Sequence, residues 1–289
     1  MSDFYITLAD ICRTFAVATE RGERNLNLSQ DIPPTPLFHL IYSHPIIMTI
    51  RTENPCDYRK VEELTREAFW NVYRPGCTEH FVLHTYRPRP EFIPELSLVL
   101  EDAGRLVGHV MFSKAELHDD AGGVHPAWTF GPISILPELQ RRRYGLTLLR
   151  EALLRARKMG VGMVCMEGNI NFYRHAGFQL ACRMGIHYHS EPRGSVVPYF
   201  LAQELIPGFL AGMEATYAPP AGYFAADDHP EAFKAYDATF PPKEKRFLPG
   251  QLPQFCKSCG KPLSGIGDCG READGSVCFD LCSGCHKAL

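Results

Sequence analysis

The stretch that decides the fold is Phe130-Gly131-Pro132-Ile133-Ser134-Ile135-Leu136-Pro137-Glu138-Leu139-Gln140-Arg141-Arg142-Arg143-Tyr144-Gly145-Leu146. Ile133 and Ile135 alternate around Ser134 as in a short strand, and Pro137 ends the pairing. Residues 147–154 then have the pattern of an amphipathic helix. A basic turn at a helix N-terminus meets unpaired backbone N–H groups and the positive end of the helix dipole, which together hold anions. This order is the layout of a pyrophosphate site.

The composition is that of an ordinary globular chain. Its 289 residues are 45% hydrophobic and 22% charged, which fits one medium-sized domain with appended pieces. The net charge of −3 gives no general attraction to nucleic acid or to an anionic membrane, so polyanion binding would need a local basic patch. No apolar run approaches the about 20 residues that span a bilayer, and the first residues lack the pattern of a secretory signal. We therefore expect a cytoplasmic protein.

Strands and helices alternate along the chain. We predict strands at residues 48–51, 96–101, 106–112, 133–135, 161–166, 178–184, 186–189 and 199–205. Asp-Ala-Gly-Arg at residues 102–105 predicts a hairpin turn, and we expect a loop at 113–127. We predict helices that begin at Asp57, span 79–86, run from the basic turn to Lys158, and span 171–176. Residues 1–47 resemble an extension, and 207–249 an ordered tail followed by a linker. The order β-α-α-β-β-β-α-β-α-β predicts an α/β fold with a mixed sheet.

This order, with a basic turn after the fourth strand, resembles the GNAT superfamily of acetyl-CoA-dependent N-acetyltransferases, in particular its prokaryotic predicted acetyltransferases. The family's turn motif is Gln/Arg-x-x-Gly-x-Gly/Ala, and residues 140–145 read Gln-Arg-Arg-Arg-Tyr-Gly. Residues 168–178 read Gly-Asn-Ile-Asn-Phe-Tyr-Arg-His-Ala-Gly-Phe, which is similar to the family's aromatic-Tyr-x-x-x-Gly-Phe after the fifth strand. The resemblance covers about residues 48–205 and includes the tail.

The resemblance implies an acetyl-CoA site on the fourth strand and its turn. The residues that it places at the coenzyme are Ile133, Ser134, Ile135, Gln140, Arg141, Arg142, Arg143, Tyr144, Gly145 and Leu146. A backbone N–H of residues 133–135 would polarise the thioester carbonyl, and the strand would pair with the pantetheine arm.

Arg143 stands where the family's turn has its first glycine. Glycine there lets the backbone approach a phosphate in any conformation, which arginine does less freely. The turn survives if Arg143 takes the right-handed helical conformation, and its guanidinium can then bind phosphate in a bidentate way. An alternative register over residues 142–147 puts Gly145 first but Thr147 last, so it also departs from the motif.

By the same resemblance, Tyr173 lies beside the coenzyme sulfur and protonates the departing thiolate. A phenol with a pKa near 10 stays protonated at neutral pH and can donate to that thiolate. The alternative is that Tyr173 only packs its helix on the sheet. The acceptor amine must also lose a proton, and the candidates are Glu167, Glu79, His80 and His125, none with spacing that favours it. His187 and His189 share one face of a strand, which suits an acceptor pocket or, as a second interpretation, a metal pair.

Six of the 11 cysteines crowd the C-terminus. The pairs Cys256/Cys259 and Cys282/Cys285 have the spacing of one tetrahedral zinc with four thiolates. Residues 254–289 resemble small prokaryotic zinc-ribbon domains, down to Cys-x-Ser-Cys-Gly-x-Pro-Leu at 256–263. About forty residues bury too little apolar surface to fold alone, so we expect a structural zinc. Cys269 and Cys278 stay open as alternative ligands, a second site, spare thiols or a labile disulfide.

The zinc-ribbon segment has balanced charge, because four basic and four acidic side chains are spread over residues 257–287. A module that reads phosphates would be basic, which argues against nucleic acid and favours a protein partner or docking on its own chain.

We therefore predict a GNAT domain at 48–250, a zinc ribbon at 253–289, and acetyl transfer to a primary amine of a small molecule or peptide. The alternative is an acyl-CoA-binding adaptor protein without turnover. A nucleic-acid-associated factor is the second alternative. The acceptor and the oligomeric state stay open.

Overall fold

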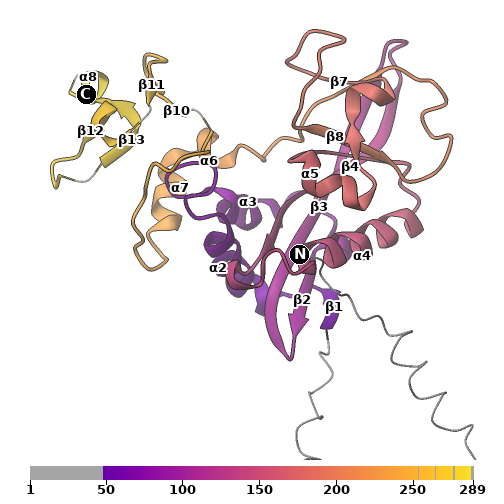
Figure 1. Ribbon diagram of the computed structural model, residues 1–289, viewed down its shortest axis with the longest axis horizontal. Helices are drawn as coiled ribbons and strands as arrows, with labels where there is room; N and C mark the ends of the chain where they lie inside the picture. The colour runs from indigo at the N-terminus through magenta and orange to yellow at the C-terminus, as the bar shows by residue number, and fades with distance from the viewer. Residues whose placement is uncertain (1–47, 253, 264, 276, 288–289) are drawn as a thin grey trace, which may run out of the picture. The chain divides into compact units, whose positions relative to one another are not determined.

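The computed structural model describes residues 48–252, 254–263, 265–275 and 277–287. The predicted N-terminal extension, residues 1–47, lies outside these ranges. The described residues form a nine-stranded sheet with helices on both faces, and two small two-stranded sheets near the C-terminus (Figure 1). The prediction of an α/β fold with a mixed sheet is confirmed, because the large sheet contains both parallel and antiparallel pairs.

The strands of the large sheet are β1 (Met48–Thr52), β2 (Leu98–Asp102), β3 (Arg105–Asp119), β4 (Val124–Ile135), β5 (Met163–Glu167), β6 (Gln179–Leu180), β7 (Ile186–Tyr188), β8 (Phe200–Glu204) and β9 (Ala215–Tyr217). They follow the order β1-β2-β3-β4-β5-β8-β6, and β9 pairs with both β3 and β7. Among the described strands, only the pairs β4/β5 and β7/β9 are parallel. The first strand and the hairpin turn after β2 were predicted, and Ala103 and Gly104 there have φ of 49° and 78°, as a tight hairpin requires.

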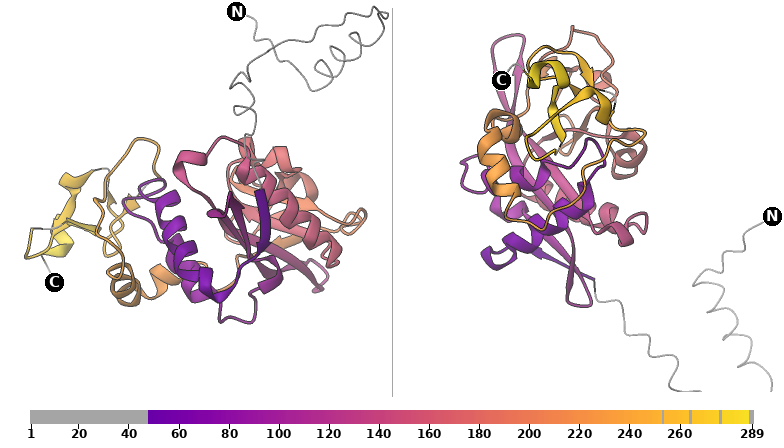
Figure 2. Two further views of the ribbon diagram at one scale, coloured as in Figure 1. Left: turned by 90° about the horizontal axis from the view of Figure 1, so that it is seen from below. Right: turned by 90° about the vertical axis from the view of Figure 1, so that its left-hand side faces the viewer.

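Helices cover the two faces of strands β1–β4 (Figures 1 and 2). On one face lie α2 (Tyr58–Phe69) and α3 (Glu79–Tyr86), and on the other α4 (Tyr144–Lys158). The side chains of β2 alternate between these layers, since Val99 packs with α2 and α3 while Leu98 and Leu100 pack with α4. All three are fully buried, so apolar side chains on both faces hold the sheet between its helices.

Strands β3 and β4 are longer than predicted, and this corrects the expectation of a loop at residues 113–127. Residues 113–118 alternate between buried and exposed, with Ala115 and Leu117 inside and Lys114, Glu116 and His118 outside. The hairpin therefore continues to Asp119, and its buried side packs with the core around β9.

Two further expectations need correction. Residues 178–184 form a strand only at 179–180, because Ala181–Met184 make a 3-10 turn that ends at Gly185 with φ 74°. Asp57 does not cap α2 with its side chain. Its carboxylate instead accepts the backbone N–H of Asn54 at 3.0 Å and pairs with Arg51 at 2.6 Å, because a 3-10 turn at Pro55–Asp57 precedes the helix.

The tail after β9 returns to the domain. It forms α6 (Ala225–Asp228) and α7 (Pro230–Asp237), two helices that were not predicted. Asp237 accepts hydrogen bonds from Arg66 Nε at 2.9 Å and from His80 Nε2 at 3.1 Å. A carboxylate only accepts, so Nε2 of His80 carries the proton. The tail is thus held by a buried polar network on α2 and α3.

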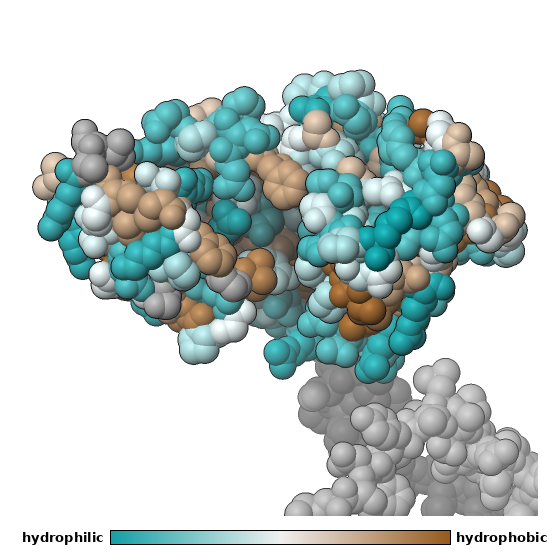
Figure 3. Space-filling model, turned by 90° about the horizontal axis from the view of Figure 1, so that it is seen from above, coloured by the Kyte–Doolittle hydropathy of each residue, from teal (hydrophilic) through white to brown (hydrophobic). Residues whose placement is uncertain are grey.

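The C-terminal segment contains β10 (Gln254–Phe255), β11 (Pro262–Leu263), β12 (Cys269–Arg271), β13 (Val277–Cys282) and α8 (Ser283–His286). The strands form two antiparallel hairpins, β10/β11 and β12/β13. Hydrophilic side chains cover most of the face shown in Figure 3. Within the described residues, none of the helices has the length and apolar character needed to cross a membrane.

Candidate functional site

Strand β4 leaves one edge open next to the basic turn. It pairs with β3 along its length but meets β5 at only one residue pair, Trp128 and Val164. Val110 pairs with Ile133 and Phe112 with Phe130, so a bulge at Gly131 and Pro132 faces Met111. In the part of the chain that the structure describes, no strand pairs with this edge beyond Trp128. The edge can therefore accept an extended ligand as an added strand.

The three β4 residues that were predicted to bind the coenzyme, 133–135, expose mainly backbone groups at that edge. Ser134 is buried, and its hydroxyl shares a hydrogen bond of 2.9 Å with Thr65 of α2. Ile133 and Ile135 pack into the core that includes α4. Their side chains thus fix the strand between the two helical layers.

The basic turn begins with a 3-10 turn at Pro137–Leu139 and ends at the first residue of α4. Gln140 closes it, because its Nε2 donates to the carbonyl of Ile135 at 3.1 Å. Arg141 and Arg143 have φ of 61° and 67°, whereas Arg142 between them does not have a positive φ. Alternating conformations of this kind turn successive backbone N–H groups toward one concavity, which is an anion-binding nest.

The conformation of Arg143 corrects the sequence-based expectation. It is left-handed, with φ 67° and ψ 0°, and not right-handed. The turn must bring the next backbone N–H groups to the start of α4. This geometry requires at Arg143 the left-handed conformation that glycine adopts easily. A left-handed residue with a side chain costs roughly 1–2 kcal/mol. Arg143 therefore keeps the geometry of the motif at an energetic cost.

Beyond the turn, α4 presents its N-terminus. The helix has 15 residues, no side-chain cap and no acidic residue in its first turn. Tyr144 points away, since its hydroxyl donates to Asp102 at 2.6 Å. Gly145 lies close to Ile135 and Phe172, at 3.5 Å from its Cβ position to each, while Leu146 is half-buried. The three arginines of the turn are exposed, so positive charge and free N–H groups meet there.

Tyr173 ends the short helix α5 (Ile170–Tyr173) that follows β5. Its ring packs against Phe172, Phe130 and Phe178, with centroid distances of 4.9, 5.8 and 6.0 Å. Burial raises the pKa of Tyr173 well above its ordinary value, so the phenol stays protonated at any physiological pH. Phe130 belongs to β4, so Tyr173, which follows β5 in the chain, packs against a side chain of β4.

Tyr73, in the loop after α2, was missed in the sequence analysis. Burial first, and then the charge of Glu79, raise the pKa of Tyr73, and burial first, and then the phenol of Tyr73, raise the pKa of Tyr173. Burial is the first cause of the raised pKa of Glu79, which is half-buried at the start of α3. The interaction of Glu79 with Tyr73 and Tyr173 could not be predicted from the sequence, because the three residues lie in separate segments.

Glu167, the second acidic candidate, ends β5 and is exposed. Its Oε1 accepts a hydrogen bond of 2.7 Å from the hydroxyl of Tyr188. Burial is the first cause of the raised pKa of Tyr199 and of Tyr223, and the charge of Glu167 adds to both. Two carboxylates, Glu79 and Glu167, therefore lie near phenol groups, one from α3 and one from β5.

The histidine candidates have structural partners. His80 is fully buried and donates to Asp237. His125 pairs with Asp119 at 2.6 Å, at the hairpin end of β4 opposite to residues 133–135. His187 pairs with Glu214 at 2.8 Å, and β7 ends before His189. Among the described residues, neither of these last two belongs to a group that could hold a metal.

The sequence comparisons agree with this geometry. Residues 61–178 match the model of the acetyltransferase (GNAT) family. This part of the chain is therefore similar in sequence to the GNAT acetyltransferases. Its match contains β2 to β5, the basic turn and Tyr173, and ends at Phe178. The predicted resemblance of residues 48–205 to this family is thus confirmed in its central part.

Relatives of the GNAT segment are known from sequence and structure. The chain is 31% identical over 88 residues to the uncharacterized N-acetyltransferase YjhQ of Escherichia coli K12, which covers 30% of this chain. It spans about half, 47%, of the length of that curated relative. The E. coli GNAT family N-acetyltransferase YhbS, solved in complex with CoA, has a TM-score of 0.53 at 21% identity and covers 62% of this chain and 92% of its own. A Brucella melitensis GNAT acetyltransferase, solved with acetyl-CoA, has a TM-score of 0.49 at 26% identity, covering 61% and 97%.

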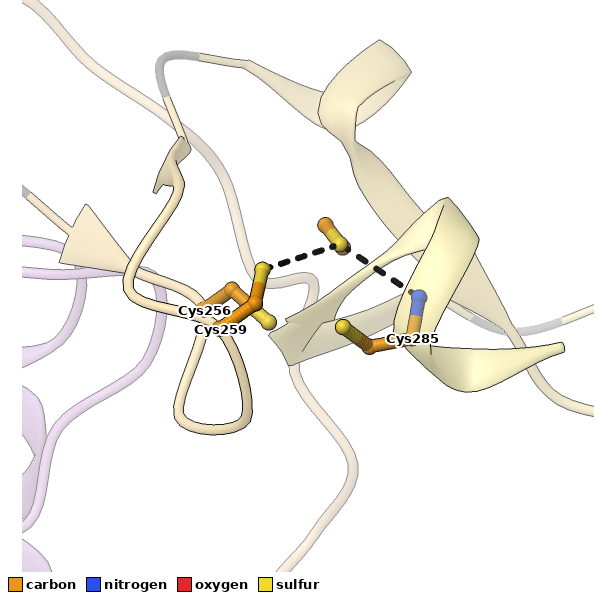
Figure 4. Close-up of side chains that lie close together, drawn as sticks. Cys256, Cys259 and Cys285 are labelled. Carbon is orange, nitrogen blue, oxygen red and sulfur yellow. Dashed lines mark hydrogen bonds between the residues drawn. The ribbon is translucent and has the colours of Figure 1, made fainter. Parts of the chain in front are cut away.

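Outside the GNAT segment, four cysteines of the C-terminal segment converge (Figure 4). The sulfur atoms of Cys256, Cys259, Cys282 and Cys285 all lie within 4.8 Å of one another. Cys259 and Cys282 are 3.7 Å apart, and the backbone N–H of Cys285 donates to the sulfur of Cys282 at 3.4 Å. Zn–S bonds of about 2.3 Å give a tetrahedral edge of about 3.8 Å, so this arrangement fits zinc. Backbone N–H groups, first that of Cys282, lower the pKa of Cys256 to about 6, which favours the thiolate.

Proposed function

We propose that this chain is an acetyl-CoA-dependent N-acetyltransferase that moves an acetyl group to a primary amine by direct attack. The observation that carries the proposal is the open edge of β4, which runs into the nest formed at Arg141 and Arg143. The pyrophosphate would lie on the nest and the N-terminus of α4, and the pantetheine arm along residues 133–135. The family match supports the same assignment.

The chemistry follows from this placement. The neutral amine nitrogen attacks the carbonyl carbon of the thioester, and a backbone N–H of β4 stabilises the oxyanion that forms. The C–S bond then breaks, the N–acetyl bond remains, and the thiolate takes a proton from the hydroxyl of Tyr173. Burial keeps the phenol protonated until the thiolate develops charge, and the proton that the amine loses returns the tyrosinate to the phenol. The amine gives up its own proton to a protein carboxylate.

Glu79 is the carboxylate that we assign to this proton. Burial raises its pKa, and a base works best when its pKa lies closer to the working pH. After burial, the charge of Glu79 contributes to the raised pKa of Tyr73, and Tyr73 contributes in the same way to that of Tyr173, which supports the assignment. Glu167 is exposed and accepts a hydrogen bond from the hydroxyl of Tyr188, so we assign it to the binding of a cationic acceptor.

The C-terminal segment would hold one structural zinc through Cys256, Cys259, Cys282 and Cys285. Four thiolates fill a tetrahedral shell and leave no position for a substrate. In the described part of this segment, short hairpins, the helix α8 and a small apolar cluster form the structure, so the metal would stabilise it. Its interaction with a protein partner stays a prediction from the balanced charge.

The experiment that tests the function measures thiol release from acetyl-CoA in the presence of a panel of primary amines. Release that depends on the amine, with the acetylated amine found by mass spectrometry, supports the enzyme. Saturable acetyl-CoA binding without release by any amine or by proteins of a cell extract would support the adaptor alternative instead.

A further inference from the structure

A second group of metal-binding side chains lies in the C-terminal segment. The ligand atoms of Glu272, Cys278 and His286 all lie within 4.8 Å of one another. They come from three places, the turn after β12, the strand β13 and the helix α8. We propose that these three side chains form a second zinc site, separate from the four-cysteine centre. The proposal is independent of the acetyl-transfer reaction.

Gly270 explains why two of these side chains converge. It pairs directly with Cys278 across the β12/β13 ladder, and directly paired residues project to the same face of a sheet. A Cβ on Gly270 would stand 2.3 Å from the Cβ of His286, so the helix residue lies against the bare backbone at this position. His286 and Cys278 therefore lie over the same face of the hairpin.

The separation of Glu272 and His286 has the length expected of two zinc ligands. Nε2 of His286 is 3.5 Å from Oε1 of Glu272. This is longer than the about 2.7–3.2 Å of an ordinary N–H···O hydrogen bond. Zn–N and Zn–O bonds of about 2.0–2.1 Å give a tetrahedral edge of about 3.4 Å. A metal between the two atoms thus needs almost no movement of either side chain.

Chemistry and charge both favour zinc at this place. Sulfur, imidazole nitrogen and carboxylate oxygen together suit a borderline divalent ion such as Zn²⁺ or Co²⁺ and disfavour Ca²⁺ or Mg²⁺. A thiolate and a carboxylate carry two negative charges, which one divalent cation neutralises. His286 and Cys278 are half-buried, and the side chain of Glu272 is 48% exposed, so an ion can reach the site from solvent.

The second site would differ from the first in one respect. Three protein ligands leave the fourth tetrahedral position open, whereas the four cysteines close their shell. The second ion should therefore exchange more readily and be removed first by a chelator. Water, or a group from a partner, would complete the coordination.

The test is the zinc content of the full chain, purified under reducing conditions, equilibrated with excess zinc and freed of unbound metal. We expect two zinc ions per chain for the wild type and one for Cys278→Ser and for His286→Asn. Cys269→Ser, a matched control at a neighbouring cysteine outside the proposed set, should keep two.

Cobalt titration shows that the variants still fold. The first equivalent should give the intense bands of a four-thiolate site in wild type and variants alike. The second should give weaker bands at shorter wavelength in the wild type and Cys269→Ser only. A wild type that binds one ion with excess zinc present, or a Cys278→Ser chain that binds two, would overturn the second site.

Discussion

The ring of Tyr173 lies directly over the α-carbon of Gly168. A Cβ at Gly168 would stand 2.3 Å from Cε2 of Tyr173, closer than any side chain tolerates. Gly168 is the first residue after β5, and its backbone N–H donates to the carbonyl of Tyr199 at 2.7 Å. The end of β5 is thus kept bare, and the ring of Tyr173 packs against this end and against Phe130 of β4.

This contact makes the role of Tyr173 testable. Tyr173→Phe keeps the ring packing and removes only the proton donor, so we expect kcat to fall by roughly 10²-fold. The dissociation constant of acetyl-CoA, measured by calorimetry, should stay within about twofold because the binding contacts are unchanged. The matched control is Tyr58→Phe in α2, on a ring that stacks with Arg87, and should leave both values unchanged. Wild-type turnover in Tyr173→Phe would leave the tyrosine a packing residue.

Glu79→Gln tests the proposed base through the pH dependence of kcat/KM. Glu79 must be deprotonated to accept a proton, so activity should rise with pH through a pKa that burial raises above its ordinary 4.5. In the variant this rise of kcat/KM with pH should vanish, and kcat/KM should fall by roughly 10²-fold. Glu63→Gln, on an exposed side chain of α2, is the control and should reproduce the wild-type profile. If kcat/KM of Glu79→Gln still rose with pH as in the wild type, the proton of the amine would be accepted by another group.

The turn predicts opposite effects of glycine at two neighbouring positions. Arg143→Gly relieves a left-handed conformation, and we expect the free energy of unfolding to rise by about 0.5–1 kcal/mol, equivalent to a Tm higher by about 2 °C. Arg142→Gly, where φ is not positive, should lower it by about the same amount. Both lose one arginine charge, so the pair isolates the backbone effect. Equal stability changes in the two variants would show that the turn is not strained at Arg143.

Asp237 should stabilise the fold in a pH-dependent way. Burial raises its pKa, but the hydrogen bonds from His80 and Arg66 outweigh this and lower it from 3.8 to about 2. Asp237→Asn leaves Arg66, whose side chain is 3% exposed, without its charge partner, so we expect a loss of about 2 kcal/mol at neutral pH. A depressed folded pKa contributes stability above the unfolded value of about 3.9, and that contribution is lost as the pH falls toward about 2.

Urea unfolding of wild type and Asp237→Asn between neutral pH and pH 2 measures this difference. The two curves should converge in the acid range. The exposed Asp228→Asn should follow the wild type within about 0.5 kcal/mol. A constant difference at all pH values would mean that the aspartate acts through packing and not through its charge.

The four-cysteine centre predicts a tightly held metal. Chain purified under reducing conditions should contain at least one zinc, and Cys256→Ser should lose it and become sensitive to proteolysis after residue 250, because the segment has a small core. Cys56→Ser, at an exposed cysteine outside the segment, should behave as the wild type. Zinc well below one ion per chain in the wild type would contradict a metal centre.

Local signals in the sequence were sufficient for several elements. Helix α3 was predicted at 79–86, and the hairpin turn at residues 102–105 was predicted from Asp-Ala-Gly-Arg. The alternation at residues 113–118 was also present, but the exposed lysine, glutamate and histidine hid a strand whose other face is buried. The alternation of apolar and polar residues at 113–118 therefore indicated a strand, although we did not predict one there.

Other features depend on contacts that no local pattern carries. Asp237 and Arg66 are 171 positions apart, so the packing of α7 on α2 follows from the tertiary fold. The left-handed conformation of Arg143 is set by the strand before it and the helix after it, which override the preference of arginine. Glu272, Cys278 and His286 have no standard ligand spacing, and only the pairing of β12 with β13 brings them together.

The most direct test of the central claim is calorimetric titration of acetyl-CoA into the full chain, repeated with Arg142→Gln. The account predicts one saturable site per chain, with affinity that falls several-fold in the variant and with added salt, because the pyrophosphate rests on the basic turn. Arg183→Gln, an exposed arginine outside the turn, should bind as the wild type. Absence of saturable binding, or equal affinity of wild type and Arg142→Gln at low salt, would contradict a coenzyme A site at residues 140–146.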